Sequence, residues 1–473
     1  MTREKASGRF YTPAYLVSNI LDLLGYSGSS ILQKHVIDNS CGDGAFLTEC
    51  VRRYCAAAQT AGTPVWRVAS ELARYIHGIE IDEVESSKCR ENVSVAAAEF
   101  GIFGVLEVAW DINCADALTV GEYDGKMDFV VGNPPYIRVH NLADSYDVVK
   151  HYYFAQKGMV DSYLVFFEVG IKMLNNEGLM GVITPSSYFT SISGSALRQY
   201  LVNTRFIRAV ANLKHFQPFD ATAYTAITVL SKTSGSTIDY YEYDVTRLVA
   251  KKISTLDYDD FCFEDGFYFG DKRDLDELRQ VLSFNNTECQ VEVKNGLCTL
   301  CNDFFIGDLP FKEYTIPIIK ASTGRSAKCL FPYDTNGKLI PYETLTQNAQ
   351  IRDYYEENSE RLRERDLERG NAWYGFGRTQ GIRDIFKNKY AINSLIRDID
   401  DLKLSWCAPR VGVYSGLYLL AGVSYDEIRG VLYTDDFMRY VRLLCKCKSG
   451  GYYTFSSKDL QKYLAYKLSG ETW

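Results

Sequence analysis

The sequence lacks a long hydrophobic run and a hydrophobic segment at its start. No uninterrupted stretch reaches the roughly 18 apolar residues that a transmembrane helix needs. The first residues, Met1 to Lys5, are charged but are not followed by the apolar core of a secretory leader. We therefore expect a cytoplasmic protein with no membrane partner.

A disulfide framework is also lacking. The 13 cysteines are scattered, and several lie in mixed apolar stretches, which suits reduced thiols. Cys298 with Cys301 and Cys445 with Cys447 form close pairs. A zinc site needs four ligands, however, and no second pair stands at a familiar spacing. We predict no metal site and leave the role of the Cys298/Cys301 pair open.

An excess of basic residues is absent. The chain has 52 Lys and Arg against 60 Asp and Glu, and its net charge is −8. This balance argues against non-specific coating of nucleic acid, but it allows a local basic cleft because whole-chain charge averages over all faces. With 473 residues, 46% of them hydrophobic, the chain is expected to form a globular protein of two or three domains.

The most informative stretch present is Asp-Phe-Val-Val-Gly-Asn-Pro-Pro-Tyr, residues 128–136. The apolar run before the glycine predicts a short buried parallel strand, and the glycine and two prolines stop it in a rigid turn. That turn would present the Asn133 side-chain oxygen and the Pro134 carbonyl as acceptors beside the Tyr136 ring. Such a site suits a planar group that carries NH2. The alternative is a prolyl turn in which Asn133 caps a helix.

Four predicted strands in succession end in polar loops. The strands are expected at residues 35–38, 75–81, around 106–110 and at 127–131. The first ends at Asp38 and is followed by the loop Asn39-Ser40-Cys41-Gly42-Asp43-Gly44. The second ends at Glu80-Ile81, and the third leads to Asp116-Ala117. Right-handed crossovers would bring these junctions to one edge of a parallel sheet. The acids in the glycine loop suit a cationic or zwitterionic ligand, and an acid after the second strand is where nucleoside-binding folds hold ribose hydroxyls.

Hydrophobic periodicity in the rest of the chain predicts the remaining helices and strands of this domain, followed by a second domain. Helices are expected at 15–24, 45–54, 65–74, 161–174 and 195–204, and strands at 178–184, 206–213 and 224–231. Residues 236–290 are predicted to be a connector, and 291–473 a second domain. In that domain, residues 373–383 mix glycines, aromatics, Arg and Gln, which are types that contact phosphates and base edges. The alternative is an ordinary surface loop.

The order of these features resembles the gamma-class DNA adenine-N6 methyltransferases of restriction-modification and type IIG systems, which use S-adenosylmethionine. The resemblance covers residues 8–231 and rests on Tyr11-Thr12-Pro13, the glycine loop, Glu80, Asp116 and Asn133-Pro134-Pro135-Tyr136. It extends loosely over the second half. It implies an α/β fold, with a doubly wound, seven-stranded Rossmann-like methyltransferase domain at 1–235 and a mixed α+β target-recognition domain at 291–473.

The resemblance also implies roles for individual residues. Asn133, Pro134 and Tyr136 would receive the target base, and Phe219 would stack on it, with Phe216 as the alternative. The cofactor pocket would include Tyr11, Thr12, Pro13, Asp38, Ser40, Gly42, Gly44, Glu80, Ile81, Asp116, Ala117, Asn133 and Pro135. Arg138, Arg378, Gln380 and Arg383 are the candidate DNA contacts. Two positions depart from the family pattern: Asn39, where many relatives have proline, and Ala117, where a larger residue is frequent.

The implied activity is methylation of an adenine flipped out of double-stranded DNA. We expect a stand-alone methylase with no fused nuclease, which could work beside a separate cognate restriction endonuclease or as an orphan. Two alternatives remain. Enzymes that methylate a protein glutamine or an RNA base amine share the Asn-Pro-Pro-Tyr motif, and the chain could be a non-catalytic DNA-binding subunit. Neither the recognition sequence nor the oligomeric state can be inferred from the residues.

Overall fold

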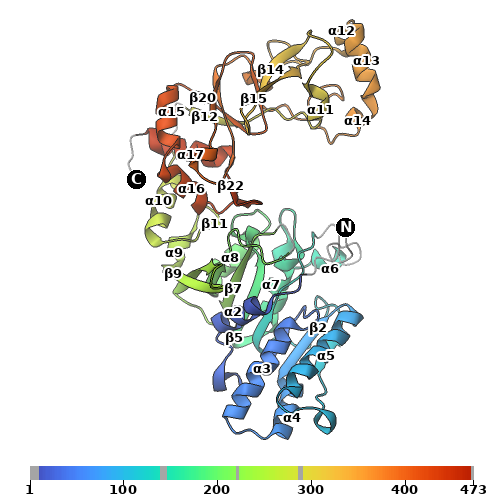
Figure 1. Ribbon diagram of the computed structural model, residues 1–473, viewed down its shortest axis with the longest axis vertical. Helices are drawn as coiled ribbons and strands as arrows, with labels where there is room; N and C mark the ends of the chain where they lie inside the picture. The colour runs from blue at the N-terminus through green and yellow to red at the C-terminus, as the bar shows by residue number, and fades with distance from the viewer. Residues whose placement is uncertain (1–9, 139–145, 220–222, 286–290, 470–473) are drawn as a thin grey trace. The chain divides into compact units, whose positions relative to one another are not determined.

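The computed structural model describes residues 10–138, 146–219, 223–285 and 291–469. Gly8 and Arg9, at the start of the predicted N-terminal motif, lie outside these residues. The chain divides into two compact units, residues 1–276 and 277–473 (Figure 1). The first unit contains the predicted Asn-Pro-Pro-Tyr turn, and the second contains the predicted recognition loop.

The first unit is built on one large sheet, whose described strands run in the order β3-β2-β1-β4-β5-β7-β6-β8-β9. The strands are β1 (Val36–Asp38), β2 (Ile76–Glu80), β3 (Asp111–Cys114), β4 (Met127–Gly132), β5 (Leu174–Pro185), β6 (Ile207–Asn212), β7 (Thr225–Ser231), β8 (Thr237–Asp244) and β9 (Val249–Asp257). The run from β3 through β2, β1 and β4 to β5 is parallel throughout, and β7 is antiparallel to both of its neighbours, β5 and β6. The predicted α/β class is confirmed.

Helices cover both faces of this sheet. One hydrophobic core includes α2 (Ala14–Leu24), α3 (Ala45–Thr60), α4 (Val65–Tyr75) and α5 (Glu83–Ala98), and the other includes α7 (Ser162–Met173) and α8 (Ser195–Thr204). The central strand β4 sends Phe129 and Val131 into the first core and Val130 into the second. Because both faces are covered, β4 is apolar almost throughout, as its sequence predicts.

Two expectations from the sequence are corrected. The third strand is β3, residues 111–114, and not residues 106–110, because Val105 and its neighbours form an exposed 3-10 turn instead. The expected connector contributes β8 and β9 to the sheet, β8 pairing with β6 and β9 with β8. β9 is an edge strand whose side chains are mostly exposed, so no hydrophobic alternation marks it in the sequence. The short elements α6 (Tyr146–Val149), α9 (Tyr258–Phe261), β10 (Cys262–Phe263) and β11 (Gly266–Phe267) complete this unit.

The second unit is mixed α+β and contains three small sheets among its described residues. The first sheet has the order β12 (Val291–Asn295), β20 (Leu417–Ala421), β16 (Lys389–Ile392) and β18 (Leu404–Cys407). The second has the order β13 (Ile306–Gly307), β15 (Arg325–Leu330), β14 (Thr315–Lys320) and β19 (Gly412–Tyr414). The third has the order β17 (Leu395–Ile396), β22 (Tyr452–Thr454) and β21 (Cys447–Lys448). The helices are α10 (Lys272–Ser283), which begins in the first unit, α11 (Asn302–Phe305), α12 (Tyr342–Leu345), α13 (Ala349–Glu357), α14 (Ser359–Arg363), α15 (Tyr425–Leu432), α16 (Asp435–Leu443) and α17 (Ser457–Leu468).

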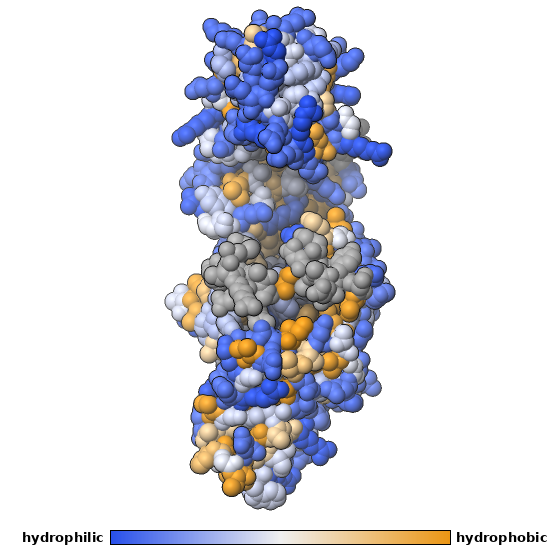
Figure 2. Space-filling view, turned by 90° about the vertical axis from the view of Figure 1, so that its right-hand side faces the viewer, coloured by the Kyte–Doolittle hydropathy of each residue, from blue (hydrophilic) through white to orange (hydrophobic). Residues whose placement is uncertain are grey.

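In the described part of the chain, no helix is both long enough and apolar enough to cross a bilayer. On the face shown in Figure 2, hydrophobic residues (orange) are interspersed with hydrophilic ones (blue).

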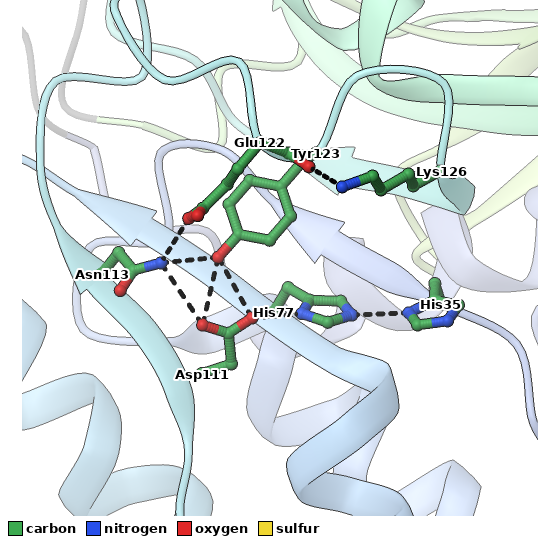
Figure 3. Close-up of polar contacts among 7 residues, drawn as sticks. All are labelled: His35, His77, Asp111, Asn113, Glu122, Tyr123 and Lys126. Carbon is green, nitrogen blue, oxygen red and sulfur yellow. Dashed lines mark hydrogen bonds and ion pairs between the residues drawn. The ribbon is translucent and has the colours of Figure 1, made fainter.

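The amino ends of the parallel strands are tied together by a polar network, which we call the amino edge (His35, His77, Asp111, Asn113 and Tyr123; Figure 3). The Asp111 carboxylate lies 2.6 Å from His77 Nδ1, accepts from the Tyr123 hydroxyl at 3.1 Å, and accepts from the Asn113 amide at 3.3 Å. His77 Nε2 is 2.8 Å from His35 Nδ1. Polar side chains at the start of adjacent strands therefore satisfy one another's hydrogen bonds.

Candidate functional site

The opposite, carboxyl ends of the same strands surround a pocket of about 270 Å³. Predicted cofactor residues that line it are Tyr11, Ser40, Gly42, Glu80, Ile81, Asp116, Ala117, Asn133 and Pro135. They come from the segment before α2, from the glycine loop after β1, and from the junctions after β2, β3 and β4. We call this group, together with Asp38, the carboxyl edge. The structure thus brings Asn133 to the pocket formed by the glycine loop and the acids.

Glycines fix the way in which these junctions meet. Gly132 has φ +153°, and a Cβ built on it would lie 2.8 Å from Asp38 Oδ1. Gly44 has φ +89°, and a Cβ there would lie 2.7 Å from the Cys89 sulfur of α5. Side chains are rarely tolerated at these angles. The glycines therefore allow the Asn-Pro-Pro-Tyr turn to lie directly beside Asp38 and allow α3 to begin against α5.

Acidic side chains are concentrated behind the pocket. Asp38 is 2% exposed, and burial raises its pKa to about 8; the Glu80 and Asp43 carboxylates add to this, while the Ser40 amide, which donates at 3.0 Å, opposes it. Glu80 is also buried and accepts from the backbone amides of Gly42 at 3.0 Å and Asp82 at 2.9 Å. A cation bound nearby would lower the pKa of Asp38 and stabilise its charged form.

Two buried polar atoms of pocket residues have no protein partner. Asn39 Nδ2 and Ser40 Oγ both lack a hydrogen bond within the described chain, although buried groups of this kind are normally paired. Asn39 and Ser40 line the pocket at the glycine loop. An unpaired amide and hydroxyl at the end of β1, beside two acids, suit a ligand that carries both polar groups and positive charge.

Asn133 is held firmly by the segment before α2. Its Nδ2 donates to the Phe10 carbonyl at 3.0 Å and to Thr12 Oγ1 at 3.1 Å. Its Oδ1 accepts from the Tyr136 hydroxyl at 2.5 Å, and that hydroxyl also lies 3.1 Å from the Ile183 carbonyl. Thr12 is buried and lies outside the pocket lining. The alternative in which Asn133 caps a helix is wrong, because its described hydrogen bonds go elsewhere.

An aromatic cluster lies beside the turn. The Phe219 ring is 6.4 Å from the Tyr136 ring, and Phe10 is 5.5 Å from Tyr136 and 5.9 Å from Phe219. Phe216 instead stacks on Tyr243 of β8 at 5.1 Å, with the two rings nearly parallel. Of the two candidates, Phe219 is therefore the one that the fold brings to Tyr136.

Some predicted cofactor residues lie next to the pocket and do not line it. Pro13 precedes α2, Gly44 precedes α3, and Asp38 lies behind Gly132. Several lining residues were not predicted: Phe10, Asn39, Ile79, Glu85, Ala115, Leu118, Ile137, Ser162 and Phe166. Ser162, at the start of α7, donates to the Pro135 carbonyl and accepts from the Ile137 amide at 3.1 Å. Only its position after an Asp at a helix start could have pointed to Ser162.

The candidate DNA contacts have different surroundings. Arg138 is half-exposed and lies 3.4 Å from the Asp161 carboxylate. In the second unit, the Arg378 guanidinium donates to the Asp366 carbonyl at 2.6 Å, and the Gln380 amide donates to the Gly296 carbonyl at 2.6 Å. Arg383 is exposed and lines a separate pocket of about 510 Å³ in that unit.

Known proteins match the part of the chain that contains this site. Residues 76–219, from β2 to Phe219, match the family model described as Eco57I restriction-modification methylase. The resemblance to restriction-modification methylases is confirmed. The methylase match includes Glu80, Asp116 and Asn133, and it lies within the first unit.

Curated relatives are methylases of the same kind. The chain is 30% identical over 261 residues to the Type II methyltransferase M.BstVI of Geobacillus stearothermophilus, covering 52% of this chain and 45% of that protein. It is 22% identical over 482 residues to the Type II restriction enzyme and methyltransferase RM.Eco57I of Escherichia coli, covering 79% of this chain and 47% of that protein. The chain therefore spans about half the length of these relatives.

Solved structures extend the likeness of fold into the second unit. The Type IIL restriction-modification enzyme MmeI, solved in complex with DNA, has a TM-score of 0.61 at 13% identity and covers 94% of this chain and 63% of that chain. A nuclease-deletion mutant of the Type ISP enzyme LlaGI, solved with a DNA substrate mimic, has a TM-score of 0.56 at 12% identity. The match covers 98% of this chain and 47% of that chain.

Proposed function

We propose that this chain is a site-specific DNA methyltransferase that transfers a methyl group from S-adenosylmethionine to the N6 amine of an adenine flipped out of double-stranded DNA. One observation carries the proposal. Asn133 belongs both to the pocket with the acids and glycine loop and to the hydrogen-bonded turn beside the Tyr136 and Phe219 rings. A donor in that pocket and a base on those rings would therefore meet at Asn133.

The pocket residues fit this cofactor chemically. When bound, S-adenosylmethionine supplies an electrophilic methyl group on a sulfonium. Glu80 would hold the ribose hydroxyls, Asp116 and Ala117 would contact the adenine, and Tyr11, Thr12 and Pro13 would lie along the methionine part. Asn39 Nδ2 and Ser40 Oγ, which have no hydrogen-bond partner among the described residues, would gain hydrogen bonds. The negative surroundings of Asp38 favour a cationic ligand over a phosphate.

Asn133 and Pro134 would make the target amine reactive. The lone pair of an exocyclic adenine amine is delocalised into the ring, so the amine is a poor nucleophile. If Asn133 Oδ1 and the Pro134 carbonyl each accept one of its protons, the nitrogen becomes pyramidal and its lone pair is aimed at the pocket. Thr12 and the Phe10 carbonyl fix the amide that does this. Well-oriented reactants contribute roughly 7–11 kcal/mol to lowering a barrier.

The aromatic cluster would compensate for removing the base from the duplex. Flipping costs a few kcal/mol, and each base–aromatic stack returns roughly 1–3 kcal/mol. Tyr136 and Phe219 are the two rings proposed for this contact. Phe216 is disfavoured because its ring already stacks on Tyr243.

The second unit is proposed to be the target-recognition domain, and DNA the partner. Arg383, exposed beside a pocket, is the preferred contact there, and Arg138 the preferred contact near the base. Arg378 and Gln380 hold their own loop through Asp366 and Gly296, so they would act by shaping that loop. A separate cognate restriction endonuclease would cut sites that this chain has not methylated.

The test is to supply the purified chain with tritiated S-adenosylmethionine and, in parallel, unmethylated DNA, ribosomal RNA or release-factor protein. Label in DNA alone, followed by sequencing of methylated bases after expression in an unmethylated host, would identify substrate, atom and site together. An Asn133→Ala protein processed in the same way controls for contaminating methylases. Label in RNA or protein, or none in DNA, would refute the proposal.

A further inference from the structure

Phe10 is the residue that joins the pocket to the aromatic cluster. It lines the pocket together with Asn133, and its ring contacts both Tyr136 at 5.5 Å and Phe219 at 5.9 Å. Its carbonyl accepts a hydrogen bond from Asn133. The rings of Phe10, Tyr136 and Phe219 thus form a closed triangle at the place where the proposed base site and cofactor pocket meet.

The spacing of the two outer rings leaves no room for a base between them. Tyr136 and Phe219 are 6.4 Å apart and nearly perpendicular, at 78°. A base stacked between two parallel rings needs about 3.5 Å on each side, or roughly 7 Å between the rings. Phe10 is tilted by 36° to Tyr136 and by 42° to Phe219, so it fills the angle between them.

The polar part of the proposed base site is also occupied from within. Asn133 Oδ1, the acceptor proposed for the target amine, receives the Tyr136 hydroxyl at 2.5 Å. The protein therefore supplies both of the contacts that an adenine would make: an aromatic ring, from Phe10, and a proton donor, from Tyr136. Such internal substitutes pair the polar group and cover the ring faces that a base would otherwise contact.

We propose that the Phe10 ring is a stand-in for the target base and is exchanged for it when DNA binds. This inference rests on the function proposed above. Rotation about the Phe10 side-chain bonds would free Tyr136 and Phe219 while its backbone carbonyl stays on Asn133. The segment that follows that carbonyl is held in place: the Tyr11 hydroxyl donates to Glu85 of α5 at 3.1 Å, and Thr12 accepts from Asn133. In this exchange the Phe10 ring leaves, the Tyr136 hydroxyl releases Asn133 Oδ1, and the Tyr136 and Phe219 rings adjust to admit the base.

When an internal group competes with DNA for the site, the apparent affinity for DNA is the intrinsic affinity multiplied by the fraction of molecules in which that group has left the site. Phe10→Ala removes the ring and keeps the carbonyl that Asn133 uses. We therefore expect the KM for DNA to fall by about five-fold or more, the factor associated with one weak aromatic stack. A residue with a purely structural role would give the opposite sign, because disturbing the site would raise KM.

The experiment measures methyl transfer to unmethylated bacterial genomic DNA, so it needs no knowledge of the recognition sequence. Phe216→Ala is the matched control, because it also removes a stacked phenylalanine from the same region but one that contacts Tyr243. Its KM should stay within two-fold of wild type. If Phe10→Ala does not fold, Phe10→Leu should still lower KM, by a smaller factor. An unchanged or raised KM in a folded Phe10 variant would overturn the inference.

A second measurement separates this inference from the proposed function. Binding of 9-methyladenine, measured by calorimetry without DNA, should be at least five-fold tighter in Phe10→Ala than in wild type. Tighter binding without methyl transfer to DNA would retain the stand-in and refute the DNA substrate. Transfer to DNA with equal 9-methyladenine binding in both proteins would retain the function and refute the stand-in.

Discussion

The two edges of the first unit's sheet carry similar residues in opposite electrostatic states. At the amino edge, hydrogen bonding from His77, with further contacts from Tyr123 and Asn113, lowers the pKa of Asp111. At the carboxyl edge, burial raises the pKa of Asp38 to about 8, and within the described part of the chain two polar atoms nearby have no hydrogen-bond partner. A polar cluster that satisfies itself stabilises the fold. A cluster that leaves polar atoms unpaired among the described residues and holds a buried acid beside other acids is arranged for a ligand.

The largest expected effect lies at the carboxyl edge. Asn133→Ala should lower turnover by about 100-fold or more, because it removes a preorganised acceptor for the reacting amine. Cofactor affinity, measured by calorimetry, should remain within a few-fold of wild type, since the other lining residues are untouched. Asn113→Ala, an asparagine of the amino edge, is the matched control and should retain turnover within two-fold. Equal losses in the two variants would abolish the distinction between the edges.

The next effect concerns stability at the amino edge. Asp111→Asn should lower the free energy of unfolding by about 1–2 kcal/mol at pH 7, because His77 and Tyr123 lose a charged acceptor. Urea denaturation monitored by circular dichroism measures this. Asp38→Asn is the comparison at the other edge and should not destabilise the unliganded protein at that pH. The amino edge would lose its structural role if Asp111→Asn were neutral.

The pH dependence of Asp38 gives a third, smaller effect. A carboxyl with a raised pKa binds more protons in the folded state than in the unfolded one, so its contribution to stability falls as pH rises from about 4 to about 8. Asp38→Asn removes this loss. The melting temperature of the variant relative to wild type should therefore increase by a few degrees between pH 5 and pH 8. A difference that stays constant with pH would argue against the raised pKa.

The smallest effect is expected from His35, which is half-buried. Burial lowers its pKa below 6.5, and the neighbouring His77 and Arg74 act in the same direction while Asp128 opposes them. Its folded state therefore resists protonation, and stability falls as pH decreases below about 6.5. His35→Asn should reduce the change in melting temperature between pH 5 and pH 6.5 by a degree or two. An unchanged slope would assign that pH dependence to other groups.

Much of the first unit could be predicted from local patterns. The helix Ser195–Thr204 was predicted with its observed bounds, and the apolar run before Gly132 forms the buried strand β4. These elements follow from hydrophobic periodicity and from the glycine and prolines that interrupt it. β9 was missed because an edge strand with exposed side chains needs no hydrophobic alternation, only a neighbour with free backbone groups.

Residues of the site that join separate segments were harder to predict. Phe10 and Ser162 reach the pocket from before α2 and from the start of α7, and neither stands in a motif that specifies a ligand. Phe219 and Phe216 are three residues apart in one loop, and the sequence favours one only modestly. The fold separates them, because Tyr243 of β8 takes the Phe216 ring. That strand lies in the stretch expected to be a connector.

By itself, the sequence determined which chemical groups stand at the strand ends and that a rigid turn presents Asn133, because backbone restriction by glycine and proline is local. Only the tertiary structure decided what those groups are bonded to. Asp38 and Asp111 are the same residue type at opposite edges of one parallel run of strands, in β1 and β3. One is buried beside other acids and the other accepts from His77 and Tyr123, since desolvation and charge pairing depend on residues far apart in the chain.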